Sequence, residues 1–321
     1  MPDWYRTRED PDHKGLETTN NITSIFLLGF PNLQNHKLLF FSLLVLLYCG
    51  TISGNFLIMV LYLVSKTLQS PMYFFITQLS IFDLLLTTDI VPVLLHTVLH
   101  GGSTITLSGC ITQFVFFANS VFSECLLLSF MSFDRYLAIC NPLRYNTIMN
   151  HMLCVIAICI IWVMGYIGTF IYVISICNLF FCGPNVIDHF YCDLEPILQL
   201  SCSDTSLIHI QSFIIGFFFA ISPFIIIATS YVYIVITILK IPSNTGRHKA
   251  FSTCSSHLIV VSIYYGTLIM VYIFPKRDQS LTIGKILSLI YTVLTPMLNP
   301  IIYTLRNRDF KEALNKLKLL L

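Results

Sequence analysis

The sequence predicts an all-α membrane protein, a bundle of seven spanning helices with the N-terminus outside and the C-terminus inside. Hydrophobic residues make up 55% of the 321 residues and charged residues only 11%, which is more apolar surface than one soluble core can bury. Seven apolar segments approach or exceed the ~20 residues that a helix needs to cross a bilayer. The basic residues are also distributed unequally between the segments that connect them.

Three regions follow one another along the chain. Residues 1–37 carry charges of both signs and include Pro2, Pro11 and Pro31, so we interpret them as a mostly disordered extracellular tail. Within it, Asn21 begins an Asn-Ile-Thr glycosylation acceptor. Residues 38–305 form the seven-helix domain and residues 306–321 a cytoplasmic tail. The predicted spanning helices are Leu38–Val64, Met72–Leu99, Ser108–Ala138, Met152–Phe180, Ile210–Leu239, Phe251–Phe274 and Ile283–Leu305.

Lysine and arginine positions decide the orientation. With the N-terminus outside, the segments on the inner side hold eleven of the eighteen basic residues: Lys66, Arg135, Arg144, Lys240, Arg247, Lys249, Arg306, Arg308, Lys311, Lys316 and Lys318. The outer loops between helices hold only Lys276 and Arg277, near Lys285. This bias is typical of cytoplasmic loops. The net charge of +2 and the lack of a long basic cluster argue against nucleic acid as a partner.

The C-terminal tail has the pattern of a short amphipathic eighth helix. Phe310, Leu314 and Leu317 recur on one helical face beside Lys311, Lys316 and Lys318. Such a helix lies on a membrane with its apolar face down and its cations near anionic headgroups. Membrane lipid of the inner leaflet is therefore an expected partner.

Four of the eleven cysteines fall on the outer side. Cys110 lies at the outer end of the third helix, and Cys182, Cys192 and Cys202 lie in the loop before the fifth. Four cysteines in an oxidising compartment suit two disulfides, for which three pairings are possible. His189, Cys192 and Asp193 lie within five residues, which leaves a metal site as an alternative use of that loop.

Polar residues in three predicted helices lie at matching depth. Asp83 is twelve residues from Pro71, Glu124 eleven from Arg135 and Asn55 eleven from Lys66, so each lies ~16–18 Å from the inner face. Intramembrane carboxyl groups pair, bind an ion or take up a proton. We predict a sodium- or proton-occupied site at Asp83 and Glu124, supported by Asn55, Ser80 and Asn299; two protonated acids bonded to their neighbours are the alternative.

Other classes of membrane protein could use the same acids. A transporter or channel is one alternative, but the chain shows no inverted repeat and no succession of polar residues through the whole membrane thickness. An intramembrane protease would need two opposed catalytic acids near a substrate gate. The sequence also lacks a His-Glu-x-x-His run, a Gly-x-Ser-x-Gly elbow and a Walker loop, so no enzyme is predicted.

Four runs occur in a characteristic order: Ser70–Phe75 (SPMYFF), Met131–Tyr145 (MSFDRYLAICNPLRY), Lys249–Leu258 (KAFSTCSSHL) and Pro296–Tyr303 (PMLNPIIY). They resemble the signatures of the vertebrate olfactory receptors, a family of rhodopsin-like G-protein-coupled receptors. The resemblance extends from about Asn21 to Arg308. It implies a rhodopsin-like bundle with disulfides Cys110–Cys192 and Cys182–Cys202.

The resemblance also implies a function without a cofactor. Such a receptor binds small, largely apolar odorants and activates a heterotrimeric stimulatory, olfactory-type G protein that raises cyclic AMP. It implies a multi-pass plasma membrane protein in the cilia of olfactory sensory neurons. A rhodopsin-like receptor for another small hydrophobic ligand remains the alternative.

Residues of the G-protein switch are expected at the inner end of the bundle. The resemblance assigns them as Asp134, Arg135, Tyr136, Tyr231, Asn299, Pro300 and Tyr303. Pro223, Pro296 and Pro300 remove backbone hydrogen bonds and permit kinks in the fifth and seventh helices. The alternative for Asp-Arg-Tyr is a simple anchor of the third helix at the headgroups.

The ligand site is expected in the outer half of the bundle. Steps of three or four residues outward from Arg135 reach Val121 and Phe117, which therefore share its inward face. The predicted ligand-binding residues are Phe117, Ala118, Val121, Gly216, Tyr265, Leu268, Tyr272, Ser288 and Thr292. For each of them, ordinary packing between helices is the alternative. An apolar lining with few polar groups suits a ligand with one or two hydrogen-bonding atoms.

Two ligand classes are made unlikely by residues that are absent. The apolar middle of the seventh helix contains no lysine, so a retinal Schiff base has no partner. Phe117 occupies the position at which amine receptors carry an acid. In the sixth helix, Tyr264-Tyr265-Gly266 stands in the place of the family's Phe-Tyr-Gly triplet, and this departure keeps the second tyrosine.

Overall fold

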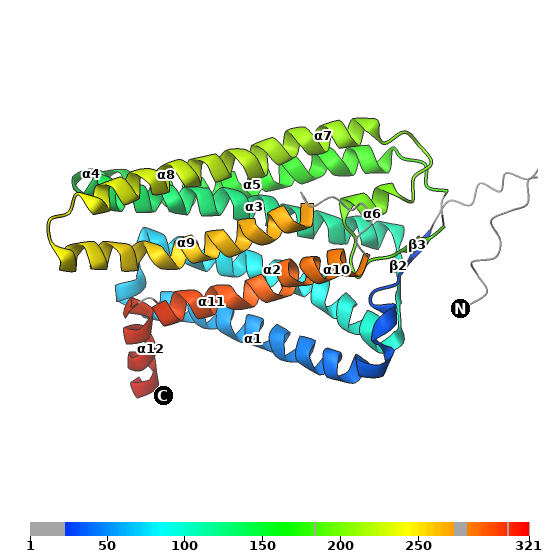
Figure 1. Cartoon of the computed structure of the whole chain (residues 1–321), viewed down its shortest axis with the longest axis horizontal. Helices are drawn as coiled ribbons and strands as arrows, with labels where there is room; N and C mark the ends of the chain where they lie inside the picture. The colour runs from blue at the N-terminus through cyan, green and yellow to red at the C-terminus, as the bar shows by residue number, and fades with distance from the viewer. Residues whose placement is uncertain (1–22, 183, 273–280, 307, 321) are drawn as a thin grey trace, which may run out of the picture.

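The computed structural model describes residues 23–182, 184–272, 281–306 and 308–320. Over this part of the chain it is a seven-helix bundle, and seven helices are long and apolar enough to cross a membrane. Figure 1 shows a small sheet at one end of the bundle and the last helix, α12, at the other. We call these the sheet end and the α12 end. The predicted glycosylation acceptor Asn21 lies outside the described residues.

The spanning segments follow the predicted ranges with small shifts at their ends. They are α1 (Lys37–Val64), α2 (Pro71–His100), α3 (Leu107–Cys140), α5 (His151–Cys177), α7–α8 (Ser206–Gly216 and Ser222–Leu239), α9 (Asn244–Tyr272) and α10–α11 (Leu281–Leu289 and Thr295–Arg306). Short helices are α4 (Pro142–Ile148), α6 (Leu194–Leu198), α12 (Arg308–Leu320) and the 3₁₀ helices η2 (Pro31–His36) and η3 (Lys66–Leu68).

Two of the spans contain a π-helical turn just before a proline. The turn η4 (Phe217–Ile221) precedes Ser222-Pro223, and η5 (Ile290–Leu294) precedes Thr295-Pro296. A proline has no N–H to continue the regular hydrogen-bond ladder, so the turn before it can widen by one residue. At Pro223 and Pro296, where kinks were predicted, the structure shows a π-helical turn directly before the proline.

Helix α3 lies at the centre of the bundle. Of its most apolar 18-residue window, 72% is buried, against 22% for α1 and for the α7–α8 span. Its buried side chains run from Cys110 to Leu137, so α3 connects the two ends of the molecule through the core.

The first strand was not expected from the sequence. β1 (Ser24–Leu27) pairs antiparallel with β2 (Ser103–Thr106) and parallel with β3 (Val186–Ile187), in the order β2-β1-β3. Ile25 and Leu27 are fully buried. The interpretation of residues 1–37 as a mostly disordered tail is thus wrong for Pro31–His36, which form η2, and for Ser24–Leu27. These four residues are stabilised by partners far away in sequence, which local composition does not reveal.

A buried lysine of α10 contacts two other segments at the sheet end. The Lys285 ammonium in α10 donates to the Gly29 carbonyl at 2.7 Å and forms an ion pair with Asp188. Lys285 is only 5% exposed. The segment before α1, the loop after α5 and the start of the last span are therefore joined at one buried charge.

Both predicted disulfides are confirmed, Cys110–Cys192 and Cys182–Cys202. They hold the loop that connects α5 to α7 over the sheet end. Phe190, Tyr191 and Cys192 in this loop are fully buried. Cys192 is consequently not a free thiolate, and no group of three possible metal-ligating residues occurs within the described ranges.

Candidate functional site

A cavity of about 610 Å³ lies within the sheet-end half of the bundle. Its walls come from α3, α5, the α7–α8 span, α9 and the loop that carries Cys192. The lining is formed by Phe114, Phe117, Ala118, Val121, Phe122, Cys125, Tyr172, Asp193, Leu194, Ser212, Phe213, Gly216, Phe219, Ala220, Ile221, Phe224, Tyr265, Leu268, Ile269 and Tyr272. Most of these side chains are aromatic or aliphatic, so the cavity suits an apolar molecule.

Seven of the nine predicted ligand-binding residues line this cavity: Phe117, Ala118, Val121, Gly216, Tyr265, Leu268 and Tyr272. The other two, Ser288 and Thr292, are buried elsewhere in the bundle. The Thr292 hydroxyl donates to the Ser288 carbonyl at 2.8 Å, so its hydrogen bond is made within its own helix. Tyr291, which the sequence did not single out, lies 6.5 Å from the Phe117 ring, centroid to centroid.

One polar group at the cavity is left without a regular hydrogen bond. Tyr265 is 4% exposed, and its hydroxyl makes no regular hydrogen bond to the described residues; the Cys125 thiol beside it is only a weak partner. Its ring lies 5.1 Å from the ring of Phe224 on α8. A buried, unsatisfied hydroxyl costs free energy, and a ligand atom that accepts its hydrogen bond recovers that cost.

The adjacent tyrosine faces the interior of the bundle. The Tyr264 hydroxyl donates to the Val121 carbonyl of α3 at 2.9 Å and lies 3.4 Å from the Tyr291 hydroxyl of η5. Tyr264 thereby connects α9 with both the cavity wall and the seventh span. Apart from its place in the Tyr264-Tyr265-Gly266 triplet, nothing in the sequence indicated these contacts of Tyr264.

A carboxylate at the loop side of the cavity was missed as a lining residue. Asp193 accepts hydrogen bonds from the Leu194 backbone N–H at 2.8 Å, Tyr272 at 3.4 Å and Tyr191 at 3.5 Å. Burial raises the pKa of Tyr191, so its phenol stays protonated and can donate. The loop is anchored to α3 as well, because the Cys192 backbone N–H donates to the Gln113 side chain at 2.9 Å.

The predicted acid site lies in the middle of the bundle. Asn299 donates to both Asp83 oxygens, at 3.1 and 3.0 Å, and Asn55 donates to the Pro296 carbonyl at 3.1 Å. Glu124 is buried within electrostatic range of Asp83. One oxygen of Glu124 and the side-chain oxygen of Asn55 have no hydrogen-bond partner in the described structure. Such orphaned oxygens are suited to a proton, a water molecule or a cation.

A third carboxyl group in the membrane was missed by the sequence-based prediction. Asp89 lies on α2, six residues from Asp83 toward the sheet end. Its carbonyl accepts from the Gln113 side chain at 3.0 Å, and one carboxyl oxygen is buried without a partner in the described ranges. An acidic residue within a predicted spanning helix was the available signal.

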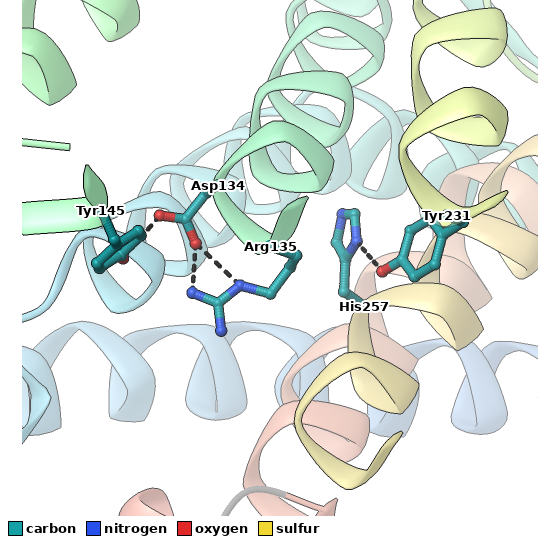
Figure 2. A network of polar contacts seen from close by, with 5 residues as sticks. All are labelled: Asp134, Arg135, Tyr145, Tyr231 and His257. Atoms are coloured by element: carbon teal, nitrogen blue, oxygen red, sulfur yellow. Dashed lines mark hydrogen bonds and ion pairs between the residues drawn. The ribbon is translucent and has the colours of Figure 1, made fainter. Parts of the chain in front are cut away.

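At the α12 end, the predicted switch residues lie around the end of α3. Arg135 forms an ion pair with Asp134, to which its Nε donates at 2.9 Å. The Tyr145 hydroxyl donates to the other Asp134 oxygen at 2.9 Å. Burial and the neighbouring carboxylate raise the pKa of Tyr145, which keeps this donor protonated. Figure 2 shows the guanidinium directed toward Asp134 and Tyr145.

A second polar pair in the same view connects α8 with α9. The hydroxyl of Tyr231 lies 2.7 Å from Nδ1 of His257. His257 is fully buried, and its Nε2 has no partner in the described part of the chain. Tyr231 was predicted as a switch residue, whereas His257 was noted only as part of a sequence run.

The remaining switch residues pack rather than pair. Tyr136 makes ring contacts with Phe133 and Tyr233, with centroids 6.4 and 6.0 Å apart. Tyr303 is 1% exposed, and its hydroxyl has no partner within the described ranges. Pro300 lies against Gly54 of α1, where a Cβ atom would meet its Cγ at 3.0 Å.

The last helix is held to the bundle. Tyr73 of α2 donates to Asp309 at 2.6 Å, and its ring lies 5.2 Å from that of Phe310, which is buried. One face of α12 thus packs against the end of α2, while its position on a membrane surface remains a prediction.

A cavity at one end of a seven-helix membrane bundle and a buried but locally paired arginine at the other are the arrangement of a G-protein-coupled receptor. Comparison with known proteins is more specific. The sequence model described as "Olfactory receptor" matches residues 44–320. The chain belongs to the olfactory receptor family, whose members are receptors and not enzymes.

Individual relatives match over nearly their whole length. Olfactory receptor 11L1 of Homo sapiens is 45% identical over 94% of this chain and 93% of its own. Olfactory receptor 10C1 of Homo sapiens is 45% identical over 93% and 96%, respectively. Olfactory receptor 1468 of Rattus norvegicus is 41% identical over 93% and 95%.

Proposed function

We propose that this receptor binds small, largely apolar odorants in the cavity between α3, the α7–α8 span and α9. The observation that carries the proposal is an apolar cavity that contains the buried hydroxyl of Tyr265, which makes no regular hydrogen bond to the part of the chain that the structure describes. A ligand with a hydrocarbon body and one hydrogen-bond acceptor satisfies both features. Ketones, esters, aldehydes and ethers with a hydrocarbon body fit this description.

The proposed output is activation of a stimulatory, olfactory-type G protein and a rise in cyclic AMP. For this, the sheet end faces outward and the α12 end inward, as the basic residues favour. Arg135 leaves Asp134 when α9 moves, and the opened cleft admits the G protein. The proposed location is the plasma membrane, in the cilia of olfactory sensory neurons, with α12 against inner-leaflet lipid.

The proposed mechanism is a shift between two packings of the bundle. A ligand favours the active packing only by the amount by which it binds that packing more tightly. Tyr264 and Tyr265 support this coupling because they lie side by side in α9, one bonded to α3 and the other lining the cavity. We further propose that Asp83 and Glu124 hold a sodium ion or a proton in the inactive packing, supported by Asn55 and Asn299.

A cyclic AMP assay in cells that supply an olfactory-type G protein tests the proposal. We expect a subset of an odorant panel to raise cyclic AMP without a ligand-dependent current. Arg135→Ala should abolish this response while ligand binding by surface-expressed receptor is kept. A ligand-dependent current without cyclic AMP would instead indicate a channel, and lost binding in the folded Arg135→Ala variant would contradict the separation of the two ends.

A further inference from the structure

The walls of the cavity differ in how they face the surroundings. Every lining residue contributed by α3 is buried or half-buried, and the loop above is closed by Phe190, Tyr191 and Cys192, which have no exposed surface. The lining residues that are exposed on the outside of the bundle are Phe213, Ile221, Phe224, Ile269 and Tyr272. All five belong to the α7–α8 span or to α9.

The exposed lining residues of the α7–α8 span lie at the depth of the hydrocarbon layer, whereas Tyr272 ends its own span, Cys254–Tyr272, at the sheet end. Phe224 is eighteen residues into the 34-residue span Ser206–Leu239, and Phe213 is seven residues into it. At ~1.5 Å per residue, the exposed edge extends for ~16 Å along the helix axis. An opening at this depth faces acyl chains rather than headgroups or water.

The sequence keeps this edge open at its centre. Gly216 lines the cavity between Phe213 and Phe219, and among the described residues no heavy atom apart from its own helix backbone and chain neighbours lies within 4 Å of a Cβ built on it. The π-helical turn η4 begins at the next residue, and such turns displace a helix locally. Toward the α12 end the edge is closed by the contact between the Phe224 and Tyr265 rings.

We propose that the cavity opens sideways into the bilayer between the α7–α8 span and α9, and that apolar ligands reach it from the hydrocarbon layer. The identity of the occupant rests on the proposed function, whereas the opening rests on the geometry alone. Compounds that partition strongly into the membrane therefore reach the site at their bilayer concentration, which exceeds their concentration in water.

Photolabelling of the reconstituted receptor tests the route without an odorant. One probe is a short alkyl diazirine dissolved in the bilayer, and the other is the same diazirine with a sulfonate that keeps it in water. Adducts are located by fragment mass spectrometry on Phe117 and Val121, which are buried and line the cavity. They are expressed relative to adducts on Ile160, which is 56% exposed on α5.

We expect the alkyl probe to label the α3 wall and the sulfonate probe to leave it unlabelled. Gly216→Trp should lower the wall labelling several-fold relative to Ile160. Gly284→Trp is the matched control. A Cβ built on Gly284 also has no neighbouring heavy atom of the described residues within 4 Å outside its own helix, but Gly284 does not line the cavity. A tryptophan at position 216 also fills part of the cavity, and this alone could lower the labelling. Phe213→Ala is therefore the second variant. It widens the opening without filling the cavity, so it should raise the labelling of the α3 wall.

Equal labelling of the α3 wall by both probes would overturn the proposal, as would equal effects of the two tryptophan variants. A fall in labelling with Phe213→Ala would do so too. Because the assay uses neither odorant nor G protein, a receptor that answered no odorant could still confirm the opening. Conversely, a receptor that responds to odorants but shows a water-facing cavity would keep the proposed function and lose this inference.

Discussion

Tyr264 and Tyr265 are adjacent in α9, but their hydroxyls have different surroundings. The Tyr264 hydroxyl is committed to the Val121 carbonyl, whereas that of Tyr265 makes no regular hydrogen bond in the described structure and lines the cavity. Removing a hydroxyl that is already bonded costs stability, and removing an unsatisfied one does not. The two residues therefore provide matched variants.

Tyr265→Phe should weaken the response to odorants that carry a hydrogen-bond acceptor and leave the response to hydrocarbons of the same size unchanged. One lost hydrogen bond of about 1 kcal/mol corresponds to roughly a fivefold higher half-maximal concentration. Cyclic AMP dose–response curves measure the change. Tyr264→Phe is the control: it should lower thermal stability, and because its hydroxyl is bonded to α3, any shift in response should be equal for both odorant classes. Equal shifts for both classes in Tyr265→Phe would refute the assignment.

At the other end of α3, Tyr145→Phe should raise basal signalling. The Tyr145 hydroxyl donates to one oxygen of Asp134 while Arg135 bonds the other. Loss of the hydroxyl leaves the carboxylate free to rotate out of the orientation that pairs it with Arg135. The gain is bounded by one hydrogen bond to a charged group, about 1.5–3 kcal/mol. Basal cyclic AMP per surface receptor is the measurement, with Tyr166→Phe in the sheet-end half of α5 as control. Unchanged or lower basal activity in Tyr145→Phe would contradict the idea.

Seven of the twenty lining residues were predicted, and helical spacing was most useful in α3, which is a regular helix over its whole length. Phe117 and Val121 follow from counting outward from Arg135. Ser288 and Thr292 did not reach the lining, because no described residue of α10, η5 or α11 lines the cavity. Which helices enclose a cavity depends on tertiary packing, which a count along the sequence does not anticipate.

At the scale of elements, contact between α3 and α5 depends on a glycine. A Cβ at Gly165 would lie 2.7 Å from Asn119 Oδ1 and 3.3 Å from the Asn119 carbonyl oxygen. Backbone cannot move aside as a flexible side chain can. The two helices therefore approach as closely as they do because residue 165 has no side chain.

Gly165→Ala should lower the free energy of unfolding by about 1–3 kcal/mol through overpacking. Gly284→Ala is the control, since an added Cβ there meets nothing within 4 Å and alanine favours helix by roughly 1 kcal/mol. Thermal unfolding of the detergent-solubilised receptor gives both values. A Gly165→Ala receptor as stable as the Gly284→Ala receptor would show that α3 and α5 can separate at no cost.

The sheet end is the part of the fold that the sequence predicted least. Its disulfides followed from family resemblance, but β1 pairs with segments about 80 and 160 residues away. Lys285 was counted only as a charge near an outer loop. Its contacts with Gly29 and Asp188 depend on the tertiary fold.

Asp188→Ala should destabilise the receptor by about 3 kcal/mol, because it leaves the buried Lys285 ammonium without its counter-charge. Asp188→Ala combined with Lys285→Met should restore much of the loss, since no charge then remains buried. A double-mutant cycle of unfolding temperatures measures the coupling. Additive effects of the two substitutions would mean that the ion pair is not a coupled unit.

On the scale of the whole molecule, α3 joins three sites that lie at successive depths. Phe117 and Val121 line the cavity, Glu124 is one turn further inward, and Arg135 lies at the α12 end. The seventh span enters at the middle level through the Asn299–Asp83 hydrogen bonds. Any change in the relative position of these spans therefore changes the contacts of Asp83 and Glu124.

If those acids hold sodium in the inactive packing, sodium should lower basal signalling of the native receptor, because a ligand of one packing shifts the equilibrium toward it. The double variant Asp83→Asn, Glu124→Gln should remove this sodium dependence. Each of the two single variants should remove most of it. The measurement is basal cyclic AMP per surface receptor, with sodium replaced by N-methylglucamine at constant ionic strength. Asp89→Asn is the matched control, a carboxyl group on the same helix α2 but nearer the sheet end, and it should keep the dependence. If the double variant responds to sodium as the native receptor does, sodium acts elsewhere; if neither responds to sodium but the native receptor alone changes with pH, a proton occupies the site.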